Sequence, residues 1–253
     1  MNIVVLLSAG LHPVSARPAS VPVELQAIRL AAGLGGTLSG LHAGPDVEAA
    51  AQALGHGLSH LVHVALPAAA DPLQSLVDQV KSAAPDLVLA GRRGQGGEDS
   101  GLLPYNLAAA LGRPIVADAM AIARNADGTL TIDQALAKGA RRRVVVRLPA
   151  VVTVHPAAPA PLPFAFGTAR RGIIERHEGV AASAPEVSPV EERPYRPRPK
   201  LIAKGPAGAS AAERLKAATQ AASGGGKLLV DPPPQEAARE ILAHLRAIGV
   251  LRR

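Results

Sequence analysis

Short aliphatic runs alternate with segments of helical periodicity through the first half of the chain. The runs are rich in Val, Leu and Ile, as expected of strands that are buried on both faces of a parallel sheet. Between them, apolar residues recur at spacings of three and four, for example at Leu73, Leu76 and Val80, which predicts helices with one buried face. The predicted strands are residues 2–7, 37–43, 58–64 and 86–90, and the predicted helices are residues 21–34, residues 46–54 and two that begin near Asp71 and near Gly101. This order predicts an α/β fold with a doubly wound, mostly parallel sheet and right-handed crossovers.

The pattern changes after Pro114. Residues 115–123, 129–132 and 143–148 predict a meander of antiparallel strands at one edge of the sheet, and residues 150–154 close it as a further strand. From His155 onward, prolines and charges are frequent, so we expect an extended arm or surface loop that has no core of its own.

A helix is predicted near the C-terminus, at residues 235–248, after a glycine-rich joint at residues 224–226. Its apolar face needs another surface to pack on, which a second chain could supply. We therefore divide the chain into an α/β nucleotide-binding domain at 1–168, a proline-rich recognition loop and linker at 169–226, and a C-terminal arm and helix at 227–253.

The stretch G-R-R-G-Q-G-G-E-D-S-G at residues 91–101 directly follows the strand at 86–90. Ligands of open α/β sheets bind at this end of the strands. The glycines allow a ligand to approach the backbone closely, Asp99 and Ser100 can cap the next helix, and the N–H groups of a helix N-terminus attract phosphate. The stretch is neither a Walker loop nor a G-x-G-x-x-G fingerprint. Its spacing alone fits a flexible surface turn as well as it fits an anion site.

Composition narrows the function. The chain of 253 residues has two Phe, two Tyr and no Trp, which argues against single-stranded nucleic-acid binding on aromatic platforms. Its net charge of +7 is dispersed and suits an anionic ligand or an acidic partner. The absence of cysteine excludes disulfides, thiolate catalysis and thiolate metal sites. With no signal peptide and no apolar run of membrane-spanning length, we expect a soluble, cytoplasmic protein without direct membrane insertion.

Candidate catalytic and metal-ligating groups are sparse. His56, His60 and His63 lie close in sequence, but they lack the helical spacing and the carboxylate of a metal site, and His60 and His63 should point to opposite faces of a strand. No G-x-S-x-G elbow occurs, and the adjacent acids Glu98 and Asp99 suit a loop cap better than acid–base catalysis. These observations favour a binding or carrier subunit with a nucleotide-sized anion site.

Several phrases of the sequence resemble the beta subunit of electron-transfer flavoproteins. They are A-L-G-H-G-L-S-H-L-V-H-V at 53–64, P-D-L-V-L-A-G-R at 85–92 with D-S-G at 99–101, L-P-A-V-V-T-V at 148–154 and G-T-A-R-R-G-I-I-E at 167–175. The phrases follow the order of the family over residues 1–175, and the D-P-P-P helix near the C-terminus adds to them.

The resemblance implies a fold of the adenine-nucleotide-alpha-hydrolase type and an electron carrier that is not an enzyme. In that family the beta subunit pairs with an alpha subunit that holds FAD, and it binds a structural AMP, which a second FAD replaces in bifurcating members. The heterodimer accepts electrons from a flavoprotein dehydrogenase and passes them to a membrane quinone oxidoreductase. We expect phosphate at Gly97 to Gly101 and adenine near the ends of the neighbouring strands. The full set of expected nucleotide-binding residues is Leu6, Gly40, Leu41, His42, Ala43, Val62, Gly91, Arg92, Gly96, Gly97, Asp99, Ser100 and Gly101.

The sequence also departs from the family. The first strand runs into S-A-G-L-H-P where the family has K-x-[VI]-P-[DE], and Leu102 replaces a glutamine of the loop. At residues 179–188, only Val180 and Val187 could serve as the apolar anchor of the recognition loop, which suggests an amine or N-methyl-amino-acid dehydrogenase as the donor.

Two other classes of function remain open. One is a stand-alone adenine-nucleotide sensor of the universal-stress type, and the C-terminal arm counts against it. The other is an α/β enzyme such as a nucleotide hydrolase, and the missing catalytic motifs count against that.

Overall fold

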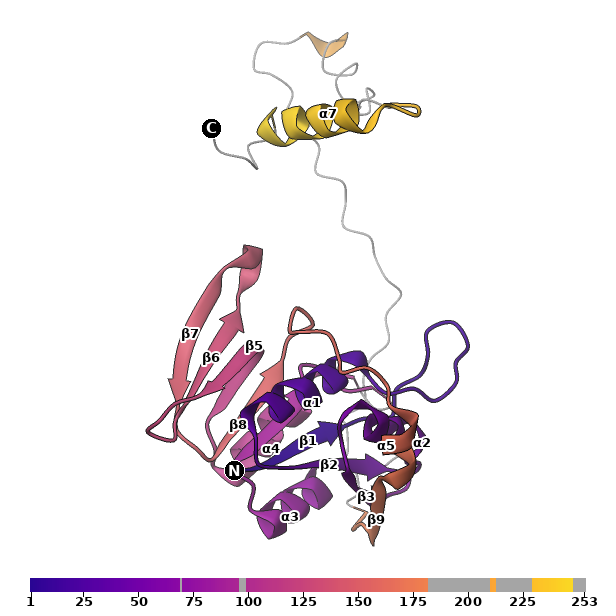
Figure 1. The fold of residues 1–253 in the computed structure, drawn as a ribbon, viewed down its shortest axis with the longest axis vertical. Helices are drawn as coiled ribbons and strands as arrows, with labels where there is room; N and C mark the ends of the chain where they lie inside the picture. The colour runs from indigo at the N-terminus through magenta and orange to yellow at the C-terminus, as the bar shows by residue number, and fades with distance from the viewer. Residues whose placement is uncertain (69, 96–98, 182–209, 213–228, 248–253) are drawn as a thin grey trace. The chain divides into compact units, whose positions relative to one another are not determined.

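The computed structural model describes residues 1–68, 70–95, 99–181, 210–212 and 229–247 (Figure 1). The chain divides into two compact units, Met1–Pro189 and Val190–Arg253, which are described separately.

The described part of the first unit contains one sheet with the strand order β7-β6-β5-β8-β4-β1-β2-β3-β9 (Figure 1). The strands are β1 (Asn2–Leu7), β2 (Thr37–Gly44), β3 (His60–Ala65), β4 (Leu87–Gly91), β5 (Ile115–Arg124), β6 (Leu130–Ala135), β7 (Arg141–Val146), β8 (Ala150–Val154) and β9 (Ile173–Glu178). The helices are α1 (Pro22–Leu34), α2 (Glu48–Ala51), α3 (Leu73–Ala83), α4 (Leu103–Leu111) and α5 (Phe166–Arg171), with short 3₁₀ turns η1 (Gln52–His56) and η2 (Ala137–Gly139).

Neighbouring strands from β5 to β9 along this order pair in parallel. Strand β6 pairs in antiparallel fashion with β5 on one side and with β7 on the other. Helices cover both faces of the sheet. One core cluster combines strand residues with α1 and η1, and the other combines them with α3 and α4. The predicted doubly wound, mostly parallel sheet with antiparallel edge strands is therefore confirmed.

The turn from α1 to β2 depends on a glycine. Gly36 has a φ of 104°, and a Cβ added there would lie 2.2 Å from the carbonyl oxygen of Met1. The neighbouring Thr37 donates its backbone N–H to that same oxygen at 3.0 Å. This close approach lets the chain leave α1 and pair at once with β1, since β2 starts in register with Asn2.

The position of β8 differs from the predicted meander. The strand does not extend the antiparallel edge. It lies between β4 and β5, parallel to both, and every residue from Ala150 to Val154 is buried. An aliphatic run without polar alternation is typical of such a central parallel strand. The antiparallel edge consists of β6 and β7, where Arg143 donates two hydrogen bonds to Asp133 across the strand pair.

The expectation of an extended arm from His155 onward is wrong for residues 155–178. Gln26 of α1 donates to the carbonyl oxygens of Pro156 at 3.0 Å and Ala158 at 2.7 Å, which ties this segment to the core. Helix α5 follows, and β9 then pairs in parallel with β3. The sequence I-I-E-R-H-E is polar for a strand because β9 is an edge strand, which buries little and is commonly charged. Within the predicted recognition loop and linker, residues 182–209 and 213–226 lie outside the described residues.

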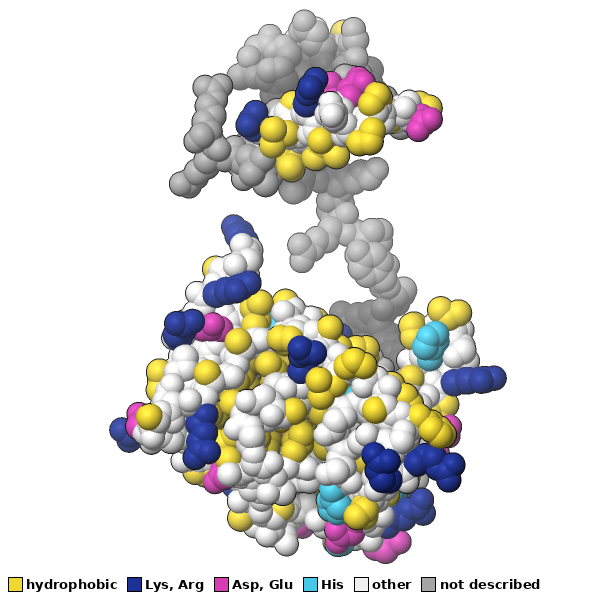
Figure 2. Space-filling model, viewed as in Figure 1, with side chains coloured by type: hydrophobic (Ala, Val, Ile, Leu, Met, Phe, Trp, Pro, Cys, Tyr) yellow, Lys and Arg dark blue, Asp and Glu magenta, His cyan; other side chains and the backbone are white. Residues whose placement is uncertain are grey.

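The second unit contains α7 (Pro234–Ala247), which confirms the helix predicted near the C-terminus. Figure 2 shows hydrophobic side chains along one side of this helix. Two of its apolar side chains, Ile241 and Leu242, are 60% and 40% exposed. Among the described residues, no helix is both long enough and apolar enough to cross a membrane.

The two-sided core leads to a stability prediction for β3. Leu61 is fully buried between the helical layer and the sheet. Leu61→Ala should lower the free energy of unfolding by about 2–5 kcal/mol, because it removes buried methyl groups and leaves a cavity. The matched control, Leu11→Ala at an exposed position, should change it by less than about 0.5 kcal/mol. Urea unfolding of both variants checks this, and equal losses would contradict the described core.

Candidate functional site

An open cavity of about 460 Å³ lies beyond the carboxyl end of β4 and is lined by Arg92, Arg93, Ser100 and Gly101. The cavity is near the place where the order of the sheet reverses. Strand β1 lies between β2 and β4 in the sheet. The chain reaches β2 through α1, which packs on one face of the sheet, and it reaches β4 through α3, which packs on the opposite face. Ligands of doubly wound sheets bind at such a switch point.

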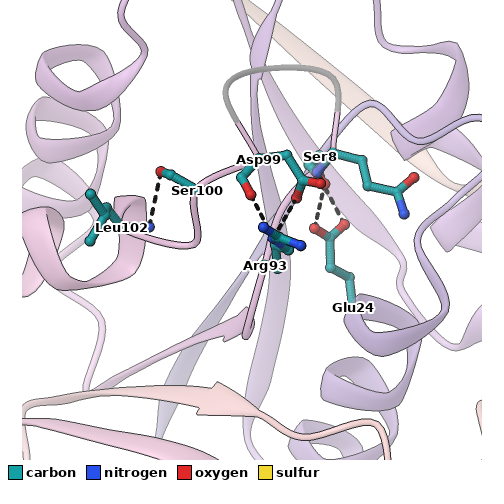
Figure 3. Close-up of polar contacts among 7 residues, drawn as sticks. Ser8, Glu24, Arg93, Asp99, Ser100 and Leu102 are labelled. Carbon is teal, nitrogen blue, oxygen red and sulfur yellow. Dashed lines mark hydrogen bonds and ion pairs between the residues drawn. The ribbon is translucent and has the colours of Figure 1, made fainter. Parts of the chain in front are cut away.

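The loop that forms the cavity folds back on itself. The guanidinium Nε of Arg93 donates to the carbonyl oxygen of Asp99 at 2.5 Å and lies 3.2 Å from its carboxylate Oδ1 (Figure 3). The hydroxyl oxygen of Ser100 accepts a hydrogen bond from the N–H of Leu102 at 3.3 Å, just before α4. Gly101 has a φ of 76°, and a Cβ added there would lie 3.0 Å from the carbonyl oxygen of Arg92. The two ends of the loop therefore meet at the cavity.

Arg92 is held from the other side by Asp118. Its Nε lies 3.4 Å from Oδ1 of Asp118 in β5, and its backbone N–H donates to Val154 of β8. Asp118 interrupts the pairing of β5 with β8, has a φ of 55° and donates its N–H to the hydroxyl of Thr153. A non-glycine residue in this conformation is strained and is often found at functional sites. The pair positions Arg92 and leaves about half of its side chain exposed to the cavity.

A buried carboxylate lies behind the loop. Glu24 of α1 is 3% exposed and accepts two hydrogen bonds from Ser8, one from the backbone N–H at 2.8 Å and one from the hydroxyl at 2.5 Å (Figure 3). The hydroxyl oxygen of Ser8 in turn accepts the backbone N–H of Gln95 at 2.9 Å. A chain of hydrogen bonds thus runs from α1 through the end of β1 to the loop.

Burial raises the pKa of Glu24 from 4.5 to about 7, because the charged form loses its hydration. The two hydrogen bonds from Ser8 act in the opposite direction and stabilise the carboxylate, but burial is the larger effect. Near neutral pH the two protonation states of Glu24 therefore have similar populations.

The structure brings part of the predicted phosphate site together. Arg92, Ser100 and Gly101 line the cavity, and Asp99 contacts the lining residue Arg93. Asp99 does not cap α4 as expected, because its carboxylate and carbonyl both face Arg93. Gly91 is buried at the end of β4, where an added Cβ would lie 2.9 Å from Val23 and 3.2 Å from Glu24. Gly96 and Gly97 lie outside the described residues.

The residues expected around adenine do not line this cavity. Leu6 and Leu41 are buried in the core cluster that includes α3 and α4, and Ala43 and Val62 pack against the same cluster. Gly40 lies against three leucines of the opposite layer. The physical reason is that helices cover both faces of the central strands, so that side chains within these strands are used for packing.

His42 is part of the packing rather than of the cavity. It is buried, its two ring nitrogens each lie 2.9 Å from a backbone carbonyl oxygen, of Leu7 and of Asp46, and its ring stacks on His63 at a centroid distance of 5.5 Å. Burial lowers the pKa of His42. His60 instead contacts Glu175 of β9 at 3.2 Å. No group of three or more His, Cys, Asp or Glu side chains among the described residues is arranged to hold a metal ion.

Sequence reasoning missed five residues that shape the loop: Ser8, Glu24, Arg93, Gln95 and Asp118. One of them left a signal in the sequence. Glu24 follows Val21 by three positions and precedes Ile28 by four, so an acid interrupts the apolar stripe of α1. An acid in such a stripe indicates a buried carboxylate with a specific partner. The backbone conformation of Asp118 left no comparable signal.

The chain is similar to known proteins over most of its length. The electron transfer flavoprotein domain matches residues 16–183. A relative described as the electron transfer flavoprotein subunit beta of Chromohalobacter salexigens is 41% identical over 223 residues, which cover 86% of this chain and 83% of the relative. The matched domain includes all four residues that line the cavity.

The raised pKa of Glu24 predicts how stability depends on pH. The folded state keeps the proton of Glu24 up to about pH 7, whereas an unfolded chain loses it near pH 4.5. Below pH 4.5 the group therefore does not lower the free energy of unfolding. As the pH rises from 4.5 through 7, the free energy of unfolding falls by about 3 kcal/mol, at 1.36 kcal/mol per pKa unit. Glu24→Gln cannot ionise, so it should gain this amount relative to the wild type between pH 4.5 and pH 8. Urea unfolding across this range is the measurement, with Glu48→Gln at an exposed position as the control. A constant difference between wild type and Glu24→Gln would show that burial does not shift this group.

Proposed function

Because the chain belongs to the electron transfer flavoprotein family, we propose that it is the beta subunit of a heterodimeric electron transfer flavoprotein. In this role the protein carries electrons and is not itself an enzyme. The match to a beta subunit over most of both chains supports this assignment over a stand-alone nucleotide sensor.

The bound nucleotide in this proposal is AMP, with its phosphate in the cavity beyond β4. The observation that carries the proposal is the cavity lining, which combines two arginines, a serine hydroxyl and a glycine next to the N-terminus of α4. Arginine side chains bind phosphate through charge and paired hydrogen bonds, and a helix N-terminus adds backbone donors. The side chains of Arg92 and Arg93 are 49% and 63% exposed, so both remain available to a ligand.

The carboxylates nearest to the cavity fit a binding role. Asp99 pairs with Arg93 and Asp118 pairs with Arg92, so each orients a cation. A phosphate would then meet arginine donors that are already oriented.

The partner in this proposal is an alpha subunit that holds FAD. Helix α7 supports such a partner, because it presents Ile241 and Leu242 to solvent along one side. Family resemblance further suggests a flavoprotein dehydrogenase as electron donor, of the amine or N-methyl-amino-acid type, and a membrane quinone oxidoreductase as acceptor. The donor class rests on residues 179–188, of which 182–188 lie outside the described part.

A charge reversal in the cavity tests the nucleotide site. Ser100→Glu should lower the affinity for AMP at least tenfold, because it places a carboxylate against the phosphate. Ser15→Glu, at an exposed position outside the cavity, is the control for a change in net charge. Nucleotide released from each purified heterodimer is quantified by mass spectrometry. Full occupancy in Ser100→Glu would exclude this cavity as the phosphate site.

A second test addresses the partner surface. Ile241→Ser should weaken the heterodimer about tenfold or more, because burial of an isoleucine side chain contributes about 1.5–3 kcal/mol. Ala243→Ser, on the same exposed helix, is the control. Binding of the alpha subunit is measured by analytical ultracentrifugation, and equal affinities of the two variants would remove α7 from the interface.

A further inference from the structure

We propose that Ser8, held by the buried carboxylate of Glu24, positions the loop of Arg92 and Arg93 for phosphate binding. This inference rests on the proposed function, because it assigns the phosphate to that loop. It adds two residues outside the cavity lining and gives them a positioning role.

With Glu24 ionised, the hydroxyl of Ser8 can donate in only one direction. A serine hydroxyl has one proton to donate and two lone pairs that accept. When Glu24 is ionised, that proton is donated to its Oε1 at 2.5 Å. The oxygen is then left as an acceptor and receives the N–H of Gln95 at 2.9 Å. Donation to a carboxylate also makes a hydroxyl oxygen a stronger acceptor. The carboxylate thus strengthens the bond that holds the loop.

Contacts on both sides of the two arginines restrict the loop. Before them, Gly91 is packed against Glu24, since an added Cβ would lie 3.2 Å from Cγ of that residue. After them, Gly94 lies against Ser8, since a Cβ added to Gly94 would lie 3.6 Å from the hydroxyl oxygen of Ser8. The backbone N–H of Gln95 donates to the same hydroxyl oxygen. Arg92 and Arg93 therefore sit between two points that the Ser8–Glu24 pair holds.

The fold alone does not explain a carboxylate at position 24. Burying an ionisable group is costly, and an apolar residue of similar size is often equally or more stable at such a site. Glu24 lies on the apolar stripe of α1, where such a residue would pack. Both of its hydrogen bonds come from Ser8, and the only further hydrogen bond of the Ser8 side chain among the described residues goes to the loop. The free-energy cost of burying Glu24 is consistent with a role in holding Ser8 and, through it, the loop.

The first experiment measures AMP binding to the heterodimer by isothermal titration calorimetry, after bound nucleotide has been removed. Ser8→Ala should raise the Kd for AMP about tenfold, because the N–H of Gln95 loses its acceptor and the loop is then no longer held at Gln95. Ser8→Thr keeps the hydroxyl and should recover most of the affinity. Ser15→Ala is the matched control at an exposed serine and should bind as the wild type does. Thermal melting of each variant separates loss of affinity from loss of folded protein.

A second measurement does not depend on the nucleotide. Trypsin cleaves after arginine, so the rate of cleavage at Arg92 and Arg93 reports how firmly the loop is held. Ser8→Ala should be cleaved several-fold faster at these two positions, and Ser8→Thr at nearly the wild-type rate. Cleavage elsewhere in the chain is the internal reference.

The outcomes are distinguishable. Wild-type affinity in Ser8→Ala, or equal losses in Ser8→Ala and Ser8→Thr, would overturn the positioning role. A wild-type heterodimer that binds no AMP would overturn the proposed nucleotide site, and the trypsin rates would still decide whether Ser8 holds the loop. Unchanged trypsin rates in Ser8→Ala would overturn the inference even if AMP binds.

Discussion

Burial of the central strands on both faces is the constraint on which the rest of this structure depends. With helices on each side, the central strands β1, β4 and β8 bury nearly all of their side chains, so these strands are largely aliphatic and the residues that line the cavity lie beyond a strand end. The cavity beside Arg92 follows from this, because it lies where β4 has just ended. The same constraint explains why both ring nitrogens of His42, a buried residue of β2, lie within hydrogen-bond distance of backbone carbonyl oxygens.

The sequence predicted those features that depend on local pattern. The aliphatic runs of β1 and β4 and the periodicity of α3 identified the elements, and their alternation identified the fold class. Long-range placement could not be predicted in the same way. The aliphatic run A-V-V-T-V is typical of a central parallel strand, but nothing local in it shows that β8 inserts between β4 and β5. The polar β9 was missed because its pairing with β3 provides the order that its own side chains do not.

In the candidate site, too, features that depend on local sequence were predicted and long-range contacts were not. The glycine-rich loop and its place after a strand were evident from the sequence, and Arg92, Ser100 and Gly101 do line the cavity. The residues predicted around adenine, such as Leu6 and Leu41, were chosen for their place near strand ends, and the structure adds that their side chains are part of the core. Contacts such as that between Ser8 and Gln95 join residues more than eighty positions apart, and only the fold brings them together.

The topology also bears on how the chain acquires its structure. His60 pairs with Ile173, more than a hundred residues later, and β8 must enter between two strands that precede it in the sequence. Contacts over such separations carry a large loop-closure entropy, and sheets dominated by them fold slowly. During synthesis, the edge of β3 and one side of β4 stay unpaired until their late partners leave the ribosome. An incomplete chain would expose these edges to aggregation or to chaperones.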